Sequence, residues 1–297
     1  MKIIFHYIQY LILRALGLIL VLLPKRAALW LGTSLGTLAF RLGLRRRVAL
    51  DNIDLSLAGS SQAHNRAIVR RLYQNLGANL AELLRFETMT CQQVKQTVTL
   101  EGIDHLDRAL QEGKGAILVS AHFGNWEMFG AALACYGYPF SVVVYPQHNR
   151  PVDRMLNRLR ASKGIEVIYK REAAREVLSA LRRNRFVTML SDQDAGTEGL
   201  MINFLGRPAS VTRGPAVFAL KTGAPIITGV IVRQEGKGHL GCIDPPLYPA
   251  LDRDRFSEMI RLTEGFTRRL EGYVLRHPDH WYWVHRRWKT RPKEQSI

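Results

Sequence analysis

Short apolar runs that alternate with helix-patterned segments are the feature that most limits how this chain can fold. Strand-like runs lie at 116–119, 140–145, 165–169, 186–190 and 225–232. Segments with helical character lie between them, at 126–135, 153–163, 172–183 and 215–221. Strands that alternate with helices are typical of parallel sheets whose faces are covered by those helices. We therefore predict an α/β fold with a mostly parallel sheet flanked by helices.

His122 follows the first apolar run, at the strand end where open α/β sheets place their chemistry. Gly124 permits a tight loop there, and Asn125 is a favourable N-cap for the next helix. Glu127 lies in the first turn of that helix, where the helix dipole favours a carboxylate. Acyl transfer to an alcohol requires a base, and a carboxylate can hold that base in the correct tautomer. His122 and Glu127 are therefore a candidate base and partner; a structural histidine is the alternative interpretation.

The string His-Phe-Gly-Asn-Trp-Glu at 122–127 resembles the lipid A late acyltransferases, relatives of the glycerolipid acyltransferases with their H-x-x-x-x-D box. Three further segments carry the resemblance: Asp192-Gln193, the run from Asn203 to Pro215, and the tail from His280 to Pro292. The resemblance extends from about Arg45 to Pro292. The first string is also similar to mannoside acyltransferases, so the resemblance is more specific for the family than for the acceptor.

The resemblance implies a glycerolipid acyltransferase-like fold and roles for two more residues. In the family, an arginine of the helix after the second strand faces the active site; Arg160 is the match, with Arg154 and Arg158 as alternatives. Asp192 matches an acidic motif, and we expect it to orient or neutralise Arg160 or the substrate. Asp192 and Asp194 could together bind Mg²⁺, but two carboxylates without further ligands make a weak site. No metal is therefore predicted.

Three polar residues complete the expected substrate-binding group, namely Asn125, Thr212 and Arg213. We expect Thr212 to cap the helix at 215–221, whose free amides are able to bind a phosphate of the donor or of the lipid. A plain helix cap is the alternative. Glu82 lies among apolar positions of a helix predicted from 66 to 86. It is interpreted as an exposed acid at the helix edge, and only secondarily as a site residue.

The first 23 residues predict contact with a membrane. Ile3 to Leu23 is long and apolar enough to span a bilayer, but Arg14 near its centre would cost roughly 2.5–3.5 kcal/mol on insertion scales. A helix that lies in the interface therefore competes with a true span. A cleaved signal peptide is disfavoured because no small-residue cleavage site follows the run. We predict an N-terminal membrane anchor of interfacial helices at 1–44 and an acyltransferase domain at 45–297.

The positive charge is concentrated at the two ends of the chain. Residues 1–50 hold eight Lys or Arg and no acid, and with the tail from Trp281 they supply 12 of the 17 net charges. The tail also interleaves tryptophans with arginines, which could stack on nucleic acid. Beside an apolar N-terminus, however, this mixture favours anionic lipid at a membrane interface. We therefore predict a membrane partner and no nucleic acid.

Several patterns in the sequence are expected to be decoys. Gly32 to Gly36 matches G-x-S-x-G but has no strand before it, and Gly236 to Gly241 matches G-x-G-x-x-G in a predicted hairpin turn. Cys91, Cys135 and Cys242 are scattered and predict neither a disulfide framework nor a zinc site. The alternative nucleophiles for a covalent route are Ser34, Ser120 and Cys135, of which Ser120 is the most serious. We favour direct transfer without an acyl-enzyme.

The resemblance implies secondary acylation of a lipid A precursor at the cytoplasmic face of the bacterial inner membrane. The expected donor is an acyl carrier protein thioester, the expected acceptor an anionic glycolipid, and no cofactor is expected. Basic residues that follow the apolar segment favour the same side of the membrane. The alternatives are a glycerolipid or phosphatidylinositol mannoside acyltransferase, and a non-enzymatic basic protein that binds membrane or RNA.

Overall fold

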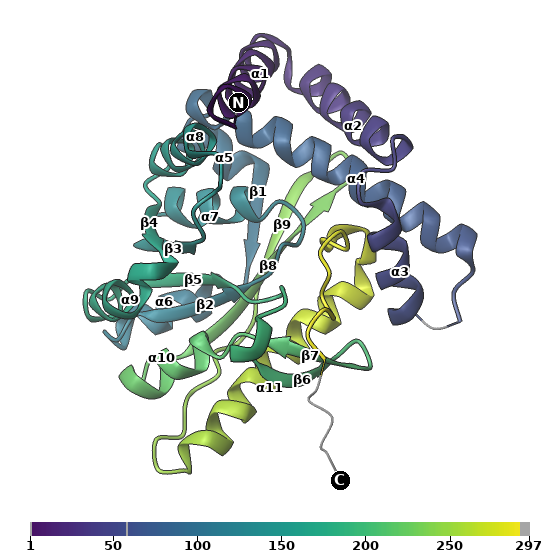
Figure 1. Ribbon diagram of the computed structural model, residues 1–297. Coiled ribbons are helices and arrows are strands. Elements are labelled where there is room, and N and C mark those ends of the chain that lie inside the picture. The colour runs from purple at the N-terminus through teal and green to yellow at the C-terminus, as the bar shows by residue number, and fades with distance from the viewer. Residues whose placement is uncertain (1, 58, 292–297) are drawn as a thin grey trace.

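The computed structural model describes residues 2–57 and 59–291. Met1, Ala58 and residues 292–297 lie outside the described residues, and with them Lys293 and Glu294 of the basic tail. The chain begins with four helices: α1 (Lys2–Leu22), α2 (Lys25–Arg41), α3 (Arg46–Ser56) and α4 (Gln62–Leu84). In Figure 1, α1 and α2 lie at one end of the molecule, next to the long helix α4.

The contact between α2 and α4 depends on glycines. A Cβ atom at Gly36 would lie 2.0 Å from the carbonyl oxygen of Tyr73, and one at Gly77 would lie 2.0 Å from that of Gly32. Only glycine allows the two backbones to approach this closely. The G-x-S-x-G string of α2 is therefore a helix-packing motif, because the strand that a nucleophile elbow requires does not precede it.

A seven-stranded sheet forms the centre of the molecule, in the order β1-β9-β8-β2-β5-β3-β4. Strands β8, β2, β5, β3 and β4 run parallel to one another, whereas β9 runs antiparallel to β8 and β1 runs parallel to β9. The bounds are β1 (Val98–Glu101), β2 (Ala116–Ser120), β3 (Phe140–Val144), β4 (Glu166–Tyr169), β5 (Phe186–Leu190), β8 (Ile226–Gln234) and β9 (Gly238–Ile243). This confirms the predicted α/β class with a mostly parallel sheet.

Helices cover both faces of the sheet (Figure 1). They are α5 (Cys91–Thr97), α6 (Ile103–Gln111), α7 (Trp126–Cys135), α8 (Arg150–Ala161), α9 (Ala173–Arg182), α10 (Gly214–Thr222) and α11 (Arg255–Arg276). Strand β2 is buried along its whole length, and its side chains alternate between two cores. Ile117 and Val119 pack with residues of α9, α10 and α11, whereas Leu118 packs with residues of α5, α6 and α7. The continuous apolar run at 116–119 reflects this burial on both sides.

Two antiparallel features interrupt the alternation. Strands β6 (Leu200–Phe204) and β7 (Arg207–Val211) form a separate hairpin, and β8 turns back into β9 at Gly236. The second turn confirms that the G-x-G-x-x-G string is a hairpin and not a dinucleotide site. Neither β6–β7 nor α11 was among the predicted elements.

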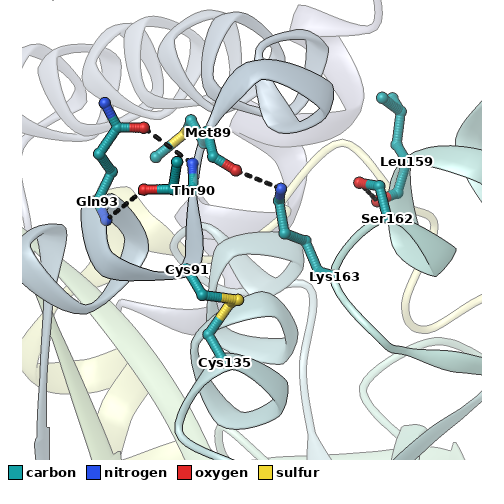
Figure 2. Close-up of a disulfide and its surroundings, with 8 residues drawn as sticks. All are labelled: Met89, Thr90, Cys91, Gln93, Cys135, Leu159, Ser162 and Lys163. Carbon is teal, nitrogen blue, oxygen red and sulfur yellow. Dashed lines mark hydrogen bonds between the residues drawn. A yellow bond between two sulfur atoms is a disulfide. The ribbon is translucent and has the colours of Figure 1, made fainter.

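The spacing of the cysteines did not indicate a disulfide, but the structure contains one. Cys91 opens α5, Cys135 closes α7, and a disulfide joins the two helices across 44 positions of sequence (Figure 2). Beside it, Thr90 and Gln93 form a capping box at the start of α5, and the ammonium group of Lys163 donates to the carbonyl of Met89. Spacing could not reveal this pair, because its proximity comes only from the packing of α5 on α7.

Candidate active site

The loop between β2 and α7 carries His122. Gly124 in this loop has φ +56°, and a Cβ atom there would lie 1.8 Å from the carbonyl oxygen of Ile231, so only glycine fits. Asn125 caps α7 as predicted, because its side-chain oxygen accepts a hydrogen bond from the amide of Met128. The loop thus places His122 at the carboxyl end of the central strand, with its side chain 23% exposed.

Asp192, at the end of the neighbouring strand β5, is the carboxylate that holds His122. Its Oδ1 lies 2.9 Å from Nδ1 of the His122 ring, and its Oδ2 accepts from the His122 amide at 3.0 Å. The indole Nε1 of Trp281 donates to Oδ2 as well, at 2.9 Å. Burial alone would raise the pKa of Asp192, but the positive charge of a protonated His122 and these hydrogen bonds outweigh it and lower that pKa. Asp192 is thus an anion that fixes the ring and its tautomer.

The predicted pairing of His122 with Glu127 is therefore wrong in this structure. Glu127 forms a two-point ion pair with Arg160 of α8, in which Nε lies 3.0 Å and Nη2 2.5 Å from the carboxylate oxygens. The remaining terminal nitrogen of Arg160 donates to Asn157 at 2.8 Å. Arg160 is thus the arginine of α8 that contacts the 122–127 segment, and its counter-ion is Glu127 and not the expected Asp192. Burial alone would lower the pKa of Arg160, but the charge and hydrogen bond of Glu127, together with the charges of Asp153 and Tyr169, outweigh it and raise that pKa.

The C-terminal tail forms one wall of the site. Trp281 pairs with Phe123 in an isolated bridge, and the amide of Tyr282 donates to the carbonyl of His122 at 3.0 Å. The rings of Trp126 and Tyr282 lie 5.1 and 5.9 Å from that of His122. The prediction that the tail's tryptophans and cations serve a membrane interface is wrong for three of them, since Trp281, Trp283 and Arg287 are at most 2% exposed.

Glu82 is a buried part of this region, not the exposed acid that was predicted. Its carboxylate binds both terminal nitrogens of Arg233 at 3.0 and 2.6 Å, and it accepts from Asn125 at 2.6 Å. Nε2 of His239 lies 3.0 Å from the same carboxylate. Burial would raise the pKa of Glu82, but the hydrogen bond and charge of His239 and those of Arg233 lower it. The carboxylate therefore ties α4 to β8, to β9 and to the loop that carries His122.

The other predicted substrate-binding residues, Asn125, Thr212 and Arg213, form hydrogen bonds or ion pairs with other groups of the protein. Asn125 is 1% exposed, and both ends of its side-chain amide bind within the protein. Thr212 does not cap α10 as predicted: the helix starts at Gly214, Arg213 occupies the N-cap position without a side-chain bond, and the Thr212 hydroxyl lies 3.4 Å from the Gly214 amide. Arg213 pairs with Glu198 at 3.4 Å on the surface. None of the three meets His122 through a recorded contact among the described residues.

The groups that other mechanisms would require are buried or already bonded to other parts of the protein. The amides of His122, Phe123 and Gly124 donate to Asp192, to the Ala121 carbonyl and to the His280 carbonyl, so they are not free to bind the oxyanion of a thioester under attack. Ser120 is 2% exposed, and Cys135 is in the disulfide. Of the described groups, the ring of His122 has the geometry of a general base: Nδ1 is held by a carboxylate, which leaves Nε2 able to take a proton.

Comparison with known proteins identifies the family of the chain. A family model described as bacterial lipid A biosynthesis acyltransferase matches residues 2–290. Lipid A biosynthesis palmitoleoyltransferase of Escherichia coli K12 is 27% identical over 285 residues, which cover 93% of this chain and 89% of the relative. Phosphatidylinositol mannoside acyltransferase of Mycobacterium tuberculosis H37Rv is 29% identical over 222 residues, which cover 72% of this chain and 68% of the relative.

A solved 1-acyl-sn-glycerophosphate acyltransferase from Thermotoga maritima covers 82% of this chain and 96% of its own, at 15% identity and a TM-score of 0.38. The family match, by contrast, extends over nearly all of the described residues and includes the His122 loop, β5 and the tail. This chain therefore belongs to the bacterial lipid A biosynthesis acyltransferases and is an acyltransferase.

Proposed function

We propose that this protein transfers a fatty acyl chain from an acyl carrier protein thioester to a hydroxyl group of a lipid A precursor, with His122 as the general base. The hydroxyl oxygen bonds to the thioester carbonyl carbon while Nε2 of His122 takes the hydroxyl proton. The carbon–sulfur bond then breaks, and the same proton passes to the leaving thiolate. An ester and a free thiol are the products, and no cofactor takes part.

The observation that carries the proposal is the contact between His122 and Asp192. An anionic carboxylate on Nδ1 holds the proton there, so Nε2 accepts, and the carboxylate stabilises the imidazolium formed during the reaction. Such a base contributes on the order of 10²–10⁴-fold in rate. The His122 ring lies next to Trp126 and Tyr282 and its side chain is 23% exposed, so a substrate can reach it.

The lipid acceptor is supported by family membership and by the N-terminal helices. Of the described helices, α1 alone is long and apolar enough to cross a membrane by itself, and only 6% of its apolar window is buried. The net charge of +17 suits an acceptor with acidic groups and a membrane with anionic lipids. On this basis we place the enzyme at the cytoplasmic face of the bacterial inner membrane. A phosphatidylinositol mannoside is the second candidate acceptor, since one of the similar relatives is named a phosphatidylinositol mannoside acyltransferase.

The decisive experiment incubates the purified protein with mixed acyl carrier protein thioesters and membrane lipid extract, and follows the lipid products by mass spectrometry. We expect a mass increase of one acyl chain on a lipid A precursor. His122→Ala should lower the rate by at least about 10²-fold, whereas Ser120→Ala should keep most of it. Transfer only to a mannoside or to a glycerolipid would show that the acceptor is that lipid and not a lipid A precursor.

A second measurement tests the direct route. Intact-mass analysis of enzyme mixed with donor alone should show no acyl adduct on the protein. An adduct that forms as fast as turnover and is absent in Ser120→Ala would establish an acyl-enzyme and overturn the single-step mechanism.

A further inference from the structure

An arginine-rich groove lies between α2 and α4, outside the site described above. It has a volume of about 670 Å³ and is lined by Phe40, Arg41, Ala63, Arg66, Ala67, Arg70, Arg71 and Gln74. No acidic residue lines it. Ala63 and Ala67, one helical turn apart on α4, form a floor of small side chains and leave the space between the arginines open.

Three of these arginines lack counter-ions. Within residues 2–57 and 59–291, the structure records no ion pair and no side-chain hydrogen bond for Arg41, Arg66 or Arg70. Arg71 differs, since it lies 3.8 Å from Asp279. Arg66 and Arg70 are like charges four positions apart on one helix, which by itself disfavours the helix slightly. Their repulsion is relieved when an anion binds between them.

One guanidinium of the groove is already held in place. The Arg66 guanidinium lies 5.5 Å from the centroid of the Phe40 ring, and Arg46 lies 5.4 Å from the same ring. Arg46 also donates to the Phe40 carbonyl at 3.0 Å. A cation–π contact orients a guanidinium without using its N–H donors. Arg66 therefore presents its full set of donors to a ligand.

The helix that carries Arg41 also exposes a row of large apolar side chains. Trp30 and Leu38 of α2 are 71% and 50% exposed, and Leu42 and Leu44 just beyond it are 68% and 59% exposed. Apolar side chains next to cations are the pattern of a surface that meets a bilayer at headgroup depth. The groove would then lie level with the lipid phosphates.

We propose that this groove binds the phosphate headgroup of a membrane lipid and prefers a phosphomonoester. A phosphomonoester carries close to two negative charges and three acceptor oxygens, which match three free guanidinium groups. A phosphodiester carries one charge and fewer free oxygens, so it satisfies the arginines less completely. The proposal concerns binding alone and does not depend on the acyl-transfer proposal.

The test measures binding of the full-length protein to phosphatidylcholine vesicles that contain either phosphatidic acid or phosphatidylglycerol, at matched negative charge and near-physiological salt. We expect tighter binding to phosphatidic acid. The double variant Arg66→Gln/Arg70→Gln should lose about tenfold in affinity for phosphatidic acid, equivalent to about 1.4 kcal/mol, and much less for phosphatidylglycerol. The matched control Arg182→Gln/Arg268→Gln removes two exposed arginines from α9 and α11 and should keep the preference.

Three results would overturn the proposal. Equal losses on both kinds of vesicle would mean that the groove contributes only general attraction to anionic surfaces. An equal loss in the control variant would mean that the net charge matters and the groove does not. Unchanged vesicle binding together with weaker binding of an acidic protein, for which acyl carrier protein is the probe, would make the groove a protein-docking surface.

Discussion

At the scale of single residues, the hydrogen bonds of Asp192 determine how it acts on His122. One oxygen faces the ring, and the other accepts from the His122 amide and from Trp281. The carboxylate is thus fixed from two directions, and it cannot turn away from the imidazole without losing both donors. In the proposed mechanism, its role is to select the tautomer of His122 and to stabilise the protonated ring.

Asp192→Asn should remove this role with little change of shape. The side-chain oxygen can still accept from the His122 amide and from Trp281, and the new amide group then faces Nδ1 as a donor. The ring must then carry its proton on Nε2, where it cannot act as a base. We expect kcat to fall by about 10²–10⁴-fold, with a melting temperature close to that of the wild type.

Asp194→Asn is the matched control for this variant. Asp194 lies two residues further on and accepts from the amide and hydroxyl of Thr290, so its replacement leaves His122 untouched. The control should retain most of the activity. A wild-type rate in Asp192→Asn would show that the tautomer of His122 is immaterial and that the imidazole is not the base.

Glu127 and Arg160 should behave as one unit. Both side chains are about 15% exposed, and each is the other's main partner. Removal of either leaves a partly buried charge without its counter-ion, so Glu127→Gln and Arg160→Gln should each lower activity. The double variant should lose less than the sum of the two single losses, with a coupling of about 0.5–3 kcal/mol in kcat/KM.

Arg158→Gln tests whether the effect is specific to the pair. Arg158 is an exposed arginine of the same helix and was an alternative choice in the sequence. It should keep full activity. Strict additivity of Glu127→Gln and Arg160→Gln, or a large loss in Arg158→Gln, would contradict the assignment of Arg160.

The sequence singles out His122 and Glu127, and the family resemblance adds Arg160 and Asp192, but the way these four residues pair could not be predicted. His122 and Glu127 are neighbours in the chain, so the sequence favours a contact between them. The partner of His122 instead comes from β5, which lies beside β2 in the sheet although 70 residues separate His122 and Asp192. Strand order decides this, and local spacing does not contain that information.

At the scale of helices and strands, the Glu82 carboxylate joins four elements next to the loop that carries His122. It contacts Arg233 of β8, His239 of β9 and Asn125 at the start of α7, and it belongs to α4 itself. Nearby, Asn79 of the same helix donates to the Gly124 carbonyl at 2.6 Å. The position of the loop therefore depends on a buried ion cluster that no local motif marks, because Arg233 and His239 come from a hairpin more than 150 residues away.

Glu82→Gln should destabilise the fold strongly, by about 3–5 kcal/mol at neutral pH, because the partly buried Arg233 loses its buried counter-ion. The folded-state pKa of Glu82 lies below its ordinary value of 4.5. Its contribution to stability is therefore complete above about pH 4.5 and is lost as the pH falls below that value. The difference in free energy of unfolding between wild type and variant should shrink over the same range.

Urea unfolding at neutral pH and at successively lower pH checks this expectation. Glu166→Gln is the control, since Glu166 is 38% exposed and pairs with Arg183 and Arg185 near the surface. It should change the free energy of unfolding by less than about 1 kcal/mol at any of these pH values. A pH-independent difference for Glu82→Gln would mean that its carboxyl group titrates alike in the folded and unfolded chain.

Several elements show the limit of periodicity as a guide. The parallel strands and their crossover helices were predictable, because each has its own apolar pattern. The pairing of β1 with β9 and the packing of Trp281 and Trp283 into the core were not. A tail in which tryptophans alternate with arginines can contact lipid or can pack against β6, β7 and α3, and its sequence looks the same in both cases. Only the tertiary contacts distinguish the two cases.

At the scale of the whole molecule, helix α1 exposes apolar side chains on its outer face and is bonded to the rest of the protein on its inner face. Asn149 donates to the His6 carbonyl and to Gln9, and Arg85 donates to the carbonyls of Leu20 and Leu23. Midway along α1, Arg14 lies 3.6 Å from Glu87. A helix that crosses the bilayer upright could not keep these contacts along its length. The geometry favours α1 lying in the interface, which also removes the cost of placing Arg14 at the bilayer centre.

The outer face of α1 should therefore hold the protein on membranes by burying apolar surface. Wild-type protein should stay with sedimented membranes in about 1 M salt, where electrostatic attraction is screened within about 3 Å. Ile4, Leu11 and Leu18 are each at least 60% exposed, so their replacement by Gln removes apolar surface and leaves the inner contacts of α1 intact. This variant should be released from the membranes.

The control replaces Leu251, Phe256 and Leu275 by Gln. These side chains are also apolar and at least 51% exposed, but they lie at or in α11, so the control should remain bound. Release of the wild type by salt alone would show that only the positive charges hold the protein, and release of the control would show that the contact is not confined to α1.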